Sequence, residues 1–234
     1  MTVLEHDAVD AAQLTPDIER FDLTERLVHW TTAVLLLCLI ATGATLYLPA
    51  LSLLVRHRAL VENVHVWSGV ALLVPLVLGV AGPWRAHLVA DIRRFDTWVR
   101  ADFDWFHRPA RRRGLLRGKF NGGQKLEAAF LASAMAGALI TGLIMRWAPS
   151  SWINWATGAT LVHDTLLLAI TAAVVGHLYY ALSSPDQLIA MVRGRISRRW
   201  AREHAPAWLA ELDGTDAGGH VPAAAPAAAD QMRT

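Results

Sequence analysis

Four long stretches of the chain contain no Asp, Glu, Lys or Arg, and these stretches constrain the fold more than any other feature. They lie between Arg26 and Arg56, Glu62 and Arg85, Glu127 and Arg146, and Asp164 and Asp186. Each holds about the 20 mostly apolar residues that a helix needs to cross a bilayer. In a bilayer a helix satisfies its backbone N–H and C=O groups within its own segment. The pattern predicts an all-α, integral membrane four-helix bundle. Core helices of a soluble protein are the alternative for any single stretch.

Proline residues near the ends of these stretches mark where the helices should stop. We expect spanning helices at about 28–49, 63–84, 123–146 and 160–183, which together make a membrane domain over 28–183. Around it we expect an N-terminal segment (1–27), a connecting loop (85–122) and a basic segment (184–213). The Gly-, Ala- and Pro-rich composition of 214–234 cannot bury a core and predicts a disordered tail.

The basic residues are distributed unevenly between the two ends of the predicted bundle. Of 22 Lys and Arg residues, only Arg56, Arg58 and Arg146 fall in the first and third connections, whereas 85–125 alone holds eleven. The positive-inside rule then places both termini and the loop 85–122 in the cytoplasm, with the chain in the bacterial cytoplasmic (inner) membrane. The run Arg108–Arg113 favours contact with anionic membrane lipids over nucleic acid, which we do not expect as a partner.

Cys38 is the only cysteine and lies in the middle of the first predicted helix. A single cysteine excludes an intrachain disulfide, a C-x-x-C-H haem attachment and a cysteine-ligated iron–sulfur cluster within this chain. Redox chemistry in this chain would therefore have to rest on other ligands.

Four histidines, His29, His65, His163 and His177, lie within or at the edge of the predicted helices. A histidine inside a membrane is costly and is a candidate functional residue. His163 and His177 are fourteen residues apart, which places them within about 40° on one helix face and about 21 Å apart along the axis. By depth, His29 then pairs with His177 at the inner side and His65 with His163 at the outer side.

Two cross-bundle imidazole pairs at two depths suit two haems, each ligated on both axial faces between helices. Iron with both axial positions filled has no open site and is suited to electron transfer. Zinc or copper is a weaker interpretation, because only two imidazoles meet at each depth. A proton relay that uses these histidines is also possible, but the sequence offers no chain of Asp or Glu between the two layers of histidines. Small residues spaced by four in the third helix, among them Gly137 and Gly142, allow close helix packing or make room for a macrocycle.

The chain resembles the cytochrome b (gamma) subunit of membrane-bound respiratory formate dehydrogenases, from about Phe21 to Leu212. The resemblance rests on R-L-V-H-W at 26–30, His65–Gly69, G-K-F-N-G-G-Q-K at 118–125, L-V-H at 161–163, G-H-L-Y at 176–179 and I-S-R-R-W-A-R-E-H at 196–204. It implies two b haems, held by His29 with His177 and by His65 with His163. It also implies a menaquinone or other quinone site at Asn121, Gly123, Gln124 and His177. From the residues alone, the N-cap of a helix is the preferred interpretation of Asn121, and the resemblance is what favours the quinone site.

The resemblance also implies a function and partners. This chain would be the di-haem membrane anchor that passes electrons from an iron–sulfur (beta) subunit to quinone on the cytoplasmic side. A catalytic (alpha) subunit would carry the molybdenum or tungsten cofactor, so quinone reduction would be the only chemistry here. The complex would tend to form a higher oligomer. A cytochrome b subunit of a thiosulfate reductase or hydrogenase, and a haem-free transporter or proton channel, remain as alternatives.

Overall fold

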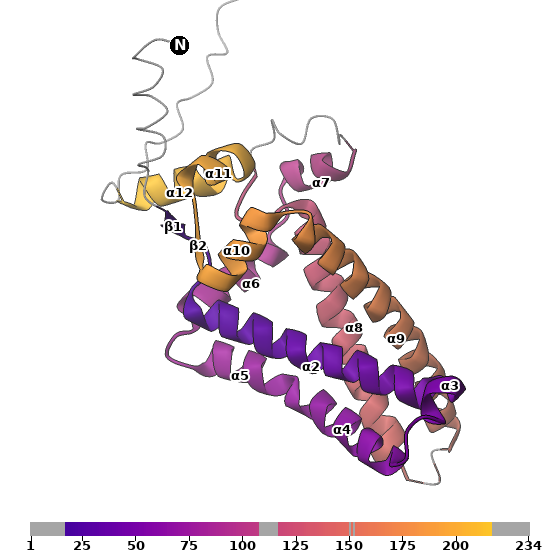
Figure 1. Cartoon of the computed structure of the whole chain (residues 1–234). Helices are drawn as coiled ribbons and strands as arrows, with labels where there is room; N and C mark the ends of the chain where they lie inside the picture. Colours follow the sequence, from indigo (N-terminus) through magenta and orange to yellow (C-terminus); the bar gives the residue numbers. More distant parts are fainter. Residues whose placement is uncertain (1–16, 108–116, 150, 152, 217–234) are drawn as a thin grey trace, which may run out of the picture.

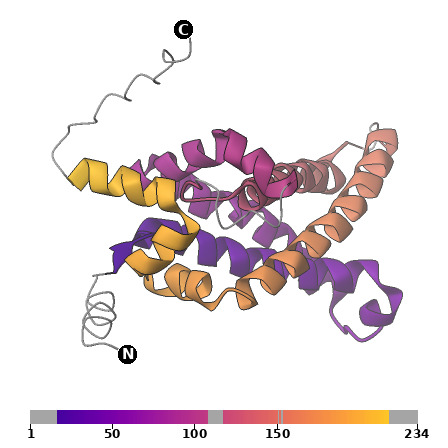
Figure 2. The ribbon, with the colours of Figure 1, turned by 90° about the horizontal axis from the view of Figure 1, so that it is seen from above.

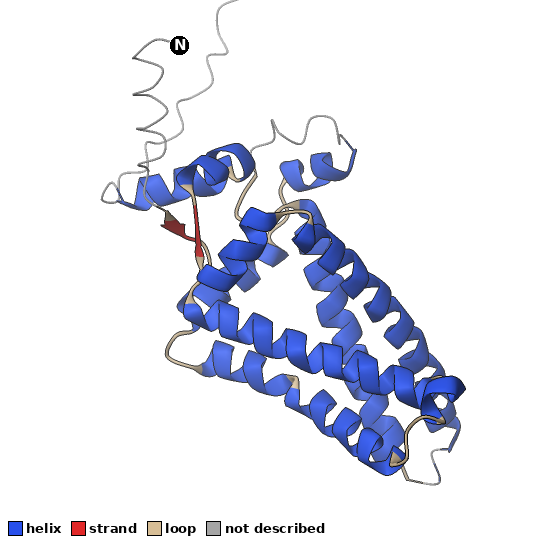
Figure 3. Ribbon diagram, viewed as in Figure 1, coloured by secondary structure: helices blue, strands red, loops and turns tan. Residues whose placement is uncertain are grey.

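The computed structural model describes residues 17–107, 117–149, 151 and 153–216, and this part of the chain is almost entirely helical (Figure 3). In chain order its elements are β1 (Ile18–Glu19), α2 (Leu23–Tyr47), α3 (Pro49–Ser52), α4 (Arg58–Ala71), α5 (Leu73–Ala81), α6 (Arg85–Asp96), α7 (Arg100–His107), α8 (Gly122–Trp147), α9 (Ile153–Leu182), α10 (Pro185–Arg193), β2 (Arg195–Ile196), α11 (Arg198–His204) and α12 (Pro206–Asp216). The run Arg108–Arg113 and residues 217–234 of the predicted tail lie outside the described residues.

Four helices are long and apolar enough to cross a membrane, namely α2, α4 with α5, α8 and α9. Their most apolar windows have mean hydropathies of 1.8 to 2.0, yet only 6 to 11% of the residues in each window are buried in the protein. Apolar side chains that face outward over whole helices are what lipid contact requires, whereas core helices of a soluble protein would be buried. The predicted all-α, membrane-spanning bundle is confirmed, and the soluble alternative is wrong.

The spanning helices extend beyond the charge-free stretches, most clearly at their N-terminal ends. The first begins at Leu23 rather than near 28, because Asp22 caps it and forms a capping box with Glu25. The third runs from Gly122 to Trp147, within a residue of its predicted bounds. The fourth begins at Ile153 rather than near 160. Polar residues at a helix end can lie at headgroup level, so the absence of charge marks only the central part of each helix.

The second spanning helix is interrupted in its middle, which the sequence analysis did not anticipate. The regular α-helix breaks at Leu72, between α4 and α5. Pro75 lies three residues further on and is buried. A proline removes one backbone donor and its ring crowds the carbonyl four residues earlier, here that of Ala71. The break therefore has a local cause in Pro75.

The spanning helices form two antiparallel hairpins, one of α2 with α4 and α5 and the other of α8 with α9 (Figure 1). Each hairpin packs closely along its own length, and α9 also contacts α2 while α4 contacts α8. Any group that bridges α9 to α2 or α4 therefore links the two hairpins.

Apart from the short helix α3, which lies at the other end of α2, the remaining elements gather at one end of the bundle and build a cap from β1, β2, α6, α7 and α10 to α12 (Figures 1 and 2). The predicted loop 85–122 thus contains two helices, and the predicted basic segment contains three helices and a strand that pairs with β1. The main cluster of buried apolar side chains lies in this cap and not between the spanning helices. Its members are Phe21, Phe120, Ala190, Ile196, Ala201, Ala205, Trp208 and Leu209.

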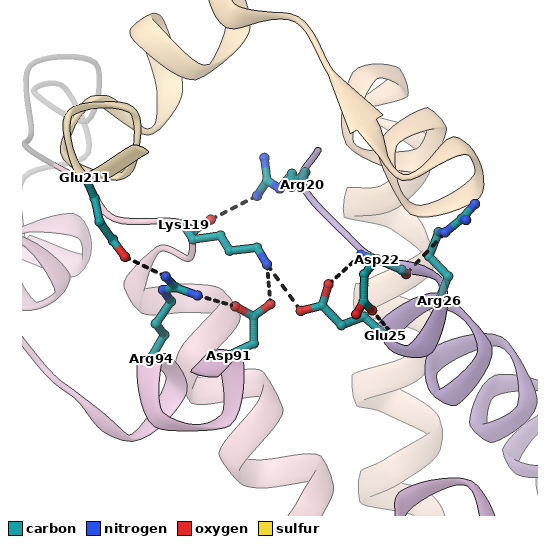
Figure 4. A network of polar contacts seen from close by, with 8 residues as sticks. All are labelled: Arg20, Asp22, Glu25, Arg26, Asp91, Arg94, Lys119 and Glu211. Atoms are coloured by element: carbon teal, nitrogen blue, oxygen red, sulfur yellow. Dashed lines mark hydrogen bonds and ion pairs between the residues drawn. The ribbon is translucent and has the colours of Figure 1, made fainter. Parts of the chain in front are cut away.

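A buried ionic network joins the cap to the start of α2 and the approach to α8 (Figure 4). The Lys119 ammonium lies 2.5 Å from an Asp91 carboxylate oxygen and 3.3 Å from one of Glu25, and all three side chains are 5% exposed. Arg94 extends the network by pairing with both Asp91 and Glu211. One lysine therefore compensates two buried carboxylates that come from α2 and α6.

Removal of the Lys119 charge should destabilise the protein strongly, because it takes the cation from buried Glu25 and leaves buried Asp91 with Arg94 alone. Lys119→Ala should cost about 3–5 kcal/mol and lower the melting temperature of the detergent-solubilised protein clearly. Arg199→Ala is the matched control. Arg199 pairs with Glu203 while 75% exposed, so its loss should cost no more than about 1 kcal/mol. Equal melting temperatures for the two variants would contradict this account of the network.

Candidate functional site

The structure brings the four helix histidines together in two pairs, one toward each end of the bundle. The ring centres of His29 in α2 and His177 in α9 are 6.2 Å apart, with a 42° angle between the ring planes. Those of His65 in α4 and His163 in α9 are 6.1 Å apart, with an angle of 72°. These are the pairs that helix depth predicts, and each links α9 of one hairpin to the other hairpin.

The separation within each pair matches two imidazoles that share one metal ion from opposite sides. A metal–nitrogen bond to histidine is about 2 Å long, so two rings on opposite faces of one ion have centres about 6 Å apart. The residues present therefore fit a haem iron with two axial imidazoles at each depth. Within the described residues, no three His, Cys, Asp or Glu side chains gather as a metal site. Structural zinc sites take four protein ligands and catalytic ones three, so the geometry favours haem over zinc.

Threonine hydroxyls orient both rings of the His65 and His163 pair. Thr42 Oγ1 lies 2.9 Å from His65 Nδ1 and donates its own proton to the Cys38 carbonyl at 2.7 Å. The same arrangement recurs on α8. Thr141 Oγ1 lies 3.0 Å from His163 Nδ1 and donates to the Gly137 carbonyl. Because each hydroxyl proton is already used, each threonine accepts from the ring N–H. The proton is thereby held on Nδ1, which leaves Nε2 available as a metal ligand.

The His29 and His177 pair has different surroundings. His177 Nδ1 lies 3.3 Å from a carboxylate oxygen of Glu127 on α8. His29 Nδ1 is buried and makes no hydrogen bond to the described residues. A carboxylate acceptor increases the basicity of an axial imidazole, so the two pairs are not equivalent as ligands.

Two glycines allow helices to approach the rings of His65 and His163. A Cβ atom on Gly43 of α2 would lie 3.3 Å from His65 Cε1, and one on Gly142 of α8 would lie 3.3 Å from His163 Cε1. Gly137, five residues before Gly142, instead faces Leu166 at 3.1 Å. Small residues of α8 thus allow close packing against the His163 ring and Leu166 of α9, and their use as space for a macrocycle stays a prediction.

The three residues predicted to border a quinone have clear structural roles at the start of α8. Asn121 is the N-cap, and it exchanges two hydrogen bonds of 3.0 Å with Gln124 in a capping box. The Gln124 amide also donates to Gln187 of α10 at 3.0 Å. A Cβ on Gly123 would lie 2.6 Å from the Trp105 ring, so this glycine admits an indole. The N-cap interpretation is confirmed, and the quinone role of these residues stays a prediction.

Two hollows lie near these groups. The smaller, of about 30 Å³, is polar and borders Asn121 and Gln124. That volume is far below the roughly 300–1,000 Å³ of typical ligand pockets, so it does not hold a quinone ring system. The larger, of about 420 Å³, is mainly apolar and is lined by α8 and α9 residues that include Thr141, the partner of His163.

Comparison with known proteins identifies the family. The model of a family described as "prokaryotic cytochrome b561" matches residues 20–194 of the chain. The chain belongs to the prokaryotic cytochrome b561 family. The family name implies b-type haem, which agrees with the paired imidazoles, so the chain is a bacterial membrane cytochrome b.

Curated relatives support the same assignment along most of the chain. The nitrate-inducible formate dehydrogenase cytochrome b556(Fdn) subunit of Escherichia coli K12 is 25% identical over 221 residues, which cover 86% of this chain and 94% of the relative. The cytochrome b556(fdo) subunit of the same strain is 24% identical and covers 83% and 93%. The Haemophilus influenzae formate dehydrogenase cytochrome b556 subunit is 24% identical and covers 80% and 79%. The resemblance to formate dehydrogenase cytochrome b subunits is confirmed.

The sequence analysis missed three residues that contact the histidines, Thr42, Thr141 and Glu127. The threonines lie among apolar residues, where a hydroxyl usually bonds its own helix, and nothing local marks their second partner. Glu127 carries a weak signal. It follows Gln124 by three residues on α8, which places both on one helix face at the start of an apolar span.

Loss of either threonine hydroxyl should weaken haem binding at the His65 and His163 pair alone. Thr42→Val and Thr141→Val should each lower haem affinity there about 10- to 100-fold, the usual effect of removing a partner of a metal-bound histidine. Haem titration of the detergent-solubilised protein, followed by absorbance, measures this. Thr171→Val is the matched control, because Thr171 bonds only the Leu167 carbonyl in its own helix. A loss as large in the control would assign the effect to the helix rather than to the rings.

Proposed function

We propose that this chain is the di-haem membrane anchor of a respiratory formate dehydrogenase and that it carries electrons across the membrane to quinone. The observation that carries the proposal is the repeated ring geometry, since two histidine pairs at two depths each match the spacing of a bis-imidazole iron. His29 with His177 and His65 with His163 would each hold one b haem, which would supply one-electron transfer without an open site for substrate.

The distribution of charge supports the orientation. The basic residues of the cap, among them Arg94, Lys119 and Arg198, lie at the bundle end where α8 begins and α9 ends. By the positive-inside rule we place the cap, both termini and the His29 and His177 pair on the cytoplasmic side. The His65 and His163 pair then lies toward the outer surface.

The route of electrons follows from this orientation. We infer that they enter from a partner iron–sulfur subunit near the His65 and His163 pair and leave near His29 and His177. The catalytic subunit, with its molybdenum or tungsten cofactor, would belong to the same complex. This assignment draws on the names of the relatives, which are cytochrome b subunits of formate dehydrogenases.

The inner pair has features that suit delivery of electrons to menaquinone or another quinone. Gln124 and Glu127 share a face of α8, and Glu127 contacts His177 on α9. Asn121, Gly123 and Gln124 therefore lie at the start of the helix that holds the partner of an inner axial ligand. An amide side chain there can hydrogen-bond a quinone carbonyl once it leaves its contact with Gln187. Proton uptake from the cytoplasmic side would then accompany quinone reduction.

A cytochrome b subunit of a thiosulfate reductase or hydrogenase is the second candidate, because identities near 25% leave the partner open. The subunits that co-purify with the native chain distinguish the two cases. The haem-free transporter or proton channel does not agree with membership of a cytochrome b family.

Loss of haem in single histidine variants tests directly which histidines hold the same haem. His65→Ala and His163→Ala should each remove the same haem and leave the other in place, whereas His29→Ala and His177→Ala should each remove the second haem. Reduced-minus-oxidised spectra with redox titration identify which haem is lost. His87→Ala, which changes a histidine of α6 outside the bundle, should retain both haems. Loss of one and the same haem in His65→Ala and His177→Ala would contradict the proposed pairing.

A further inference from the structure

Arg20 is a buried cation whose hydrogen bonds are incomplete. It lies between β1 and α2, and the residue is only 3% exposed. Its Nη2 donates to the Lys119 carbonyl at 3.0 Å, but Nε and Nη1 are buried and make no hydrogen bond to the described residues. A guanidinium has five N–H donors, and unmade hydrogen bonds of a buried charged group are costly.

The neighbours of Arg20 compensate its charge only in part. The guanidinium carbon lies 4.4 Å from the centre of the Trp200 ring, a cation–π contact over the ring face. Burial lowers the pKa of the Arg20 guanidinium to about 10, against a smaller opposing effect of Asp91. The Asp91 carboxylate itself binds Lys119 and Arg94. Within the part of the chain that the structure describes, Arg20 therefore has no carboxylate partner of its own.

Arg20 lines the small polar hollow described above, together with Arg117 and Lys119. The other lining residues are Gly118, Asn121, Gln124, Gln187, Trp200 and His204. None of these residues is acidic, and the carboxylates that balance Lys119 are not among them. The hollow thus gathers positive charge and N–H donors around a volume of about 30 Å³, which suits a small compact anion.

The hollow lies at the level where the spanning helices meet the cap. Arg20 precedes the start of α2 by three residues, Asn121 is the N-cap of α8, and Gln187 follows the end of α9 by five residues. Basic pockets at this depth on the cytoplasmic side of membrane proteins bind phospholipid headgroups.

We propose that this hollow is a phosphate-binding site in which Arg20 provides the central donors, and that it takes the phosphate of an anionic phospholipid headgroup or a free phosphate ion. The site is separate from the histidine pairs but shares Asn121 and Gln124 with the proposed quinone site, and it does not rest on the electron route proposed above. The lipid source does rest on the proposed cytoplasmic position of the cap. Arg20 Nε and Nη1 would donate to phosphate oxygens, while the Trp200 ring keeps the guanidinium in place.

Calorimetric titration of the purified full-length protein in neutral detergent tests the site. The probes are inorganic phosphate and the short-chain lipid dihexanoyl phosphatidylglycerol, with sodium chloride at equal ionic strength as the reference. Wild-type protein should bind one or both phosphate probes. Arg20→Gln should bind them at least tenfold more weakly, and Arg20→Lys should fall between, because it keeps the charge and loses the planar donor pair.

Arg199→Gln is the matched control, because Arg199 lies on α11 beside Trp200 but is 75% exposed. It should bind both probes as the wild type does. Tighter binding of the lipid than of inorganic phosphate assigns the site to a headgroup, and equal binding assigns it to free phosphate. If Arg20→Gln binds both probes like wild type, or wild type binds neither beyond chloride, the proposal is wrong. If the Arg20 variants do not fold, the binding of the two phosphate probes by the wild-type protein, compared with chloride, still tests the proposal.

Discussion

Paired histidine rings link the two hairpins of the bundle at two depths. Each spanning window buries at most 11% of its residues in the protein, so the helices share no extended core of their own. His29 and His177 meet at one depth, and His65 and His163 at the other, with ring centres 6.2 and 6.1 Å apart. Because α9 supplies one ring to each pair, a shift of this helix would disturb both sites. Haem iron held by each of these pairs would join the hairpins further, in addition to the helix contacts of α2 with α9 and of α4 with α8.

The two ends of the bundle are built differently. The cap end contains the apolar cluster around Ala190 and Trp208 and the buried network around Lys119. These interactions fix the start of α2 and the approach to α8, and so they position His29 and the residues near His177. At the other end, threonine hydroxyls on α2 and α8 orient the rings of His65 and His163. One pair has a carboxylate neighbour and the other has hydroxyls, which makes two ligand sites of different basicity within one bundle.

Much of this arrangement could be predicted because membrane helices obey simple rules of length, charge and depth. Runs without charge located the four spanning helices. The helical repeat placed His163 and His177 at opposite ends of one helix, so that His163 pairs with His65 and His177 with His29. The break near Pro75, the helices within 85–122 and the role of Glu127 could not be predicted in this way. Pro75 sits inside an apolar run, α6 and α7 are stabilised by contacts such as the buried Lys125–Asp102 pair at 2.6 Å, and Glu127 matters only because α9 brings His177 to it. These features arise from tertiary contacts between segments far apart in the chain.

The most direct test of the account is a count of haem per chain. The full-length protein, purified from its native membrane in mild detergent, would be assayed by the pyridine haemochrome method together with a reduced-minus-oxidised spectrum. The ring geometry predicts two non-covalent b haems per chain, since each imidazole pair can fill both axial positions of one iron. No haem, or only one, in the folded and natively expressed protein would contradict the assignment of both histidine pairs.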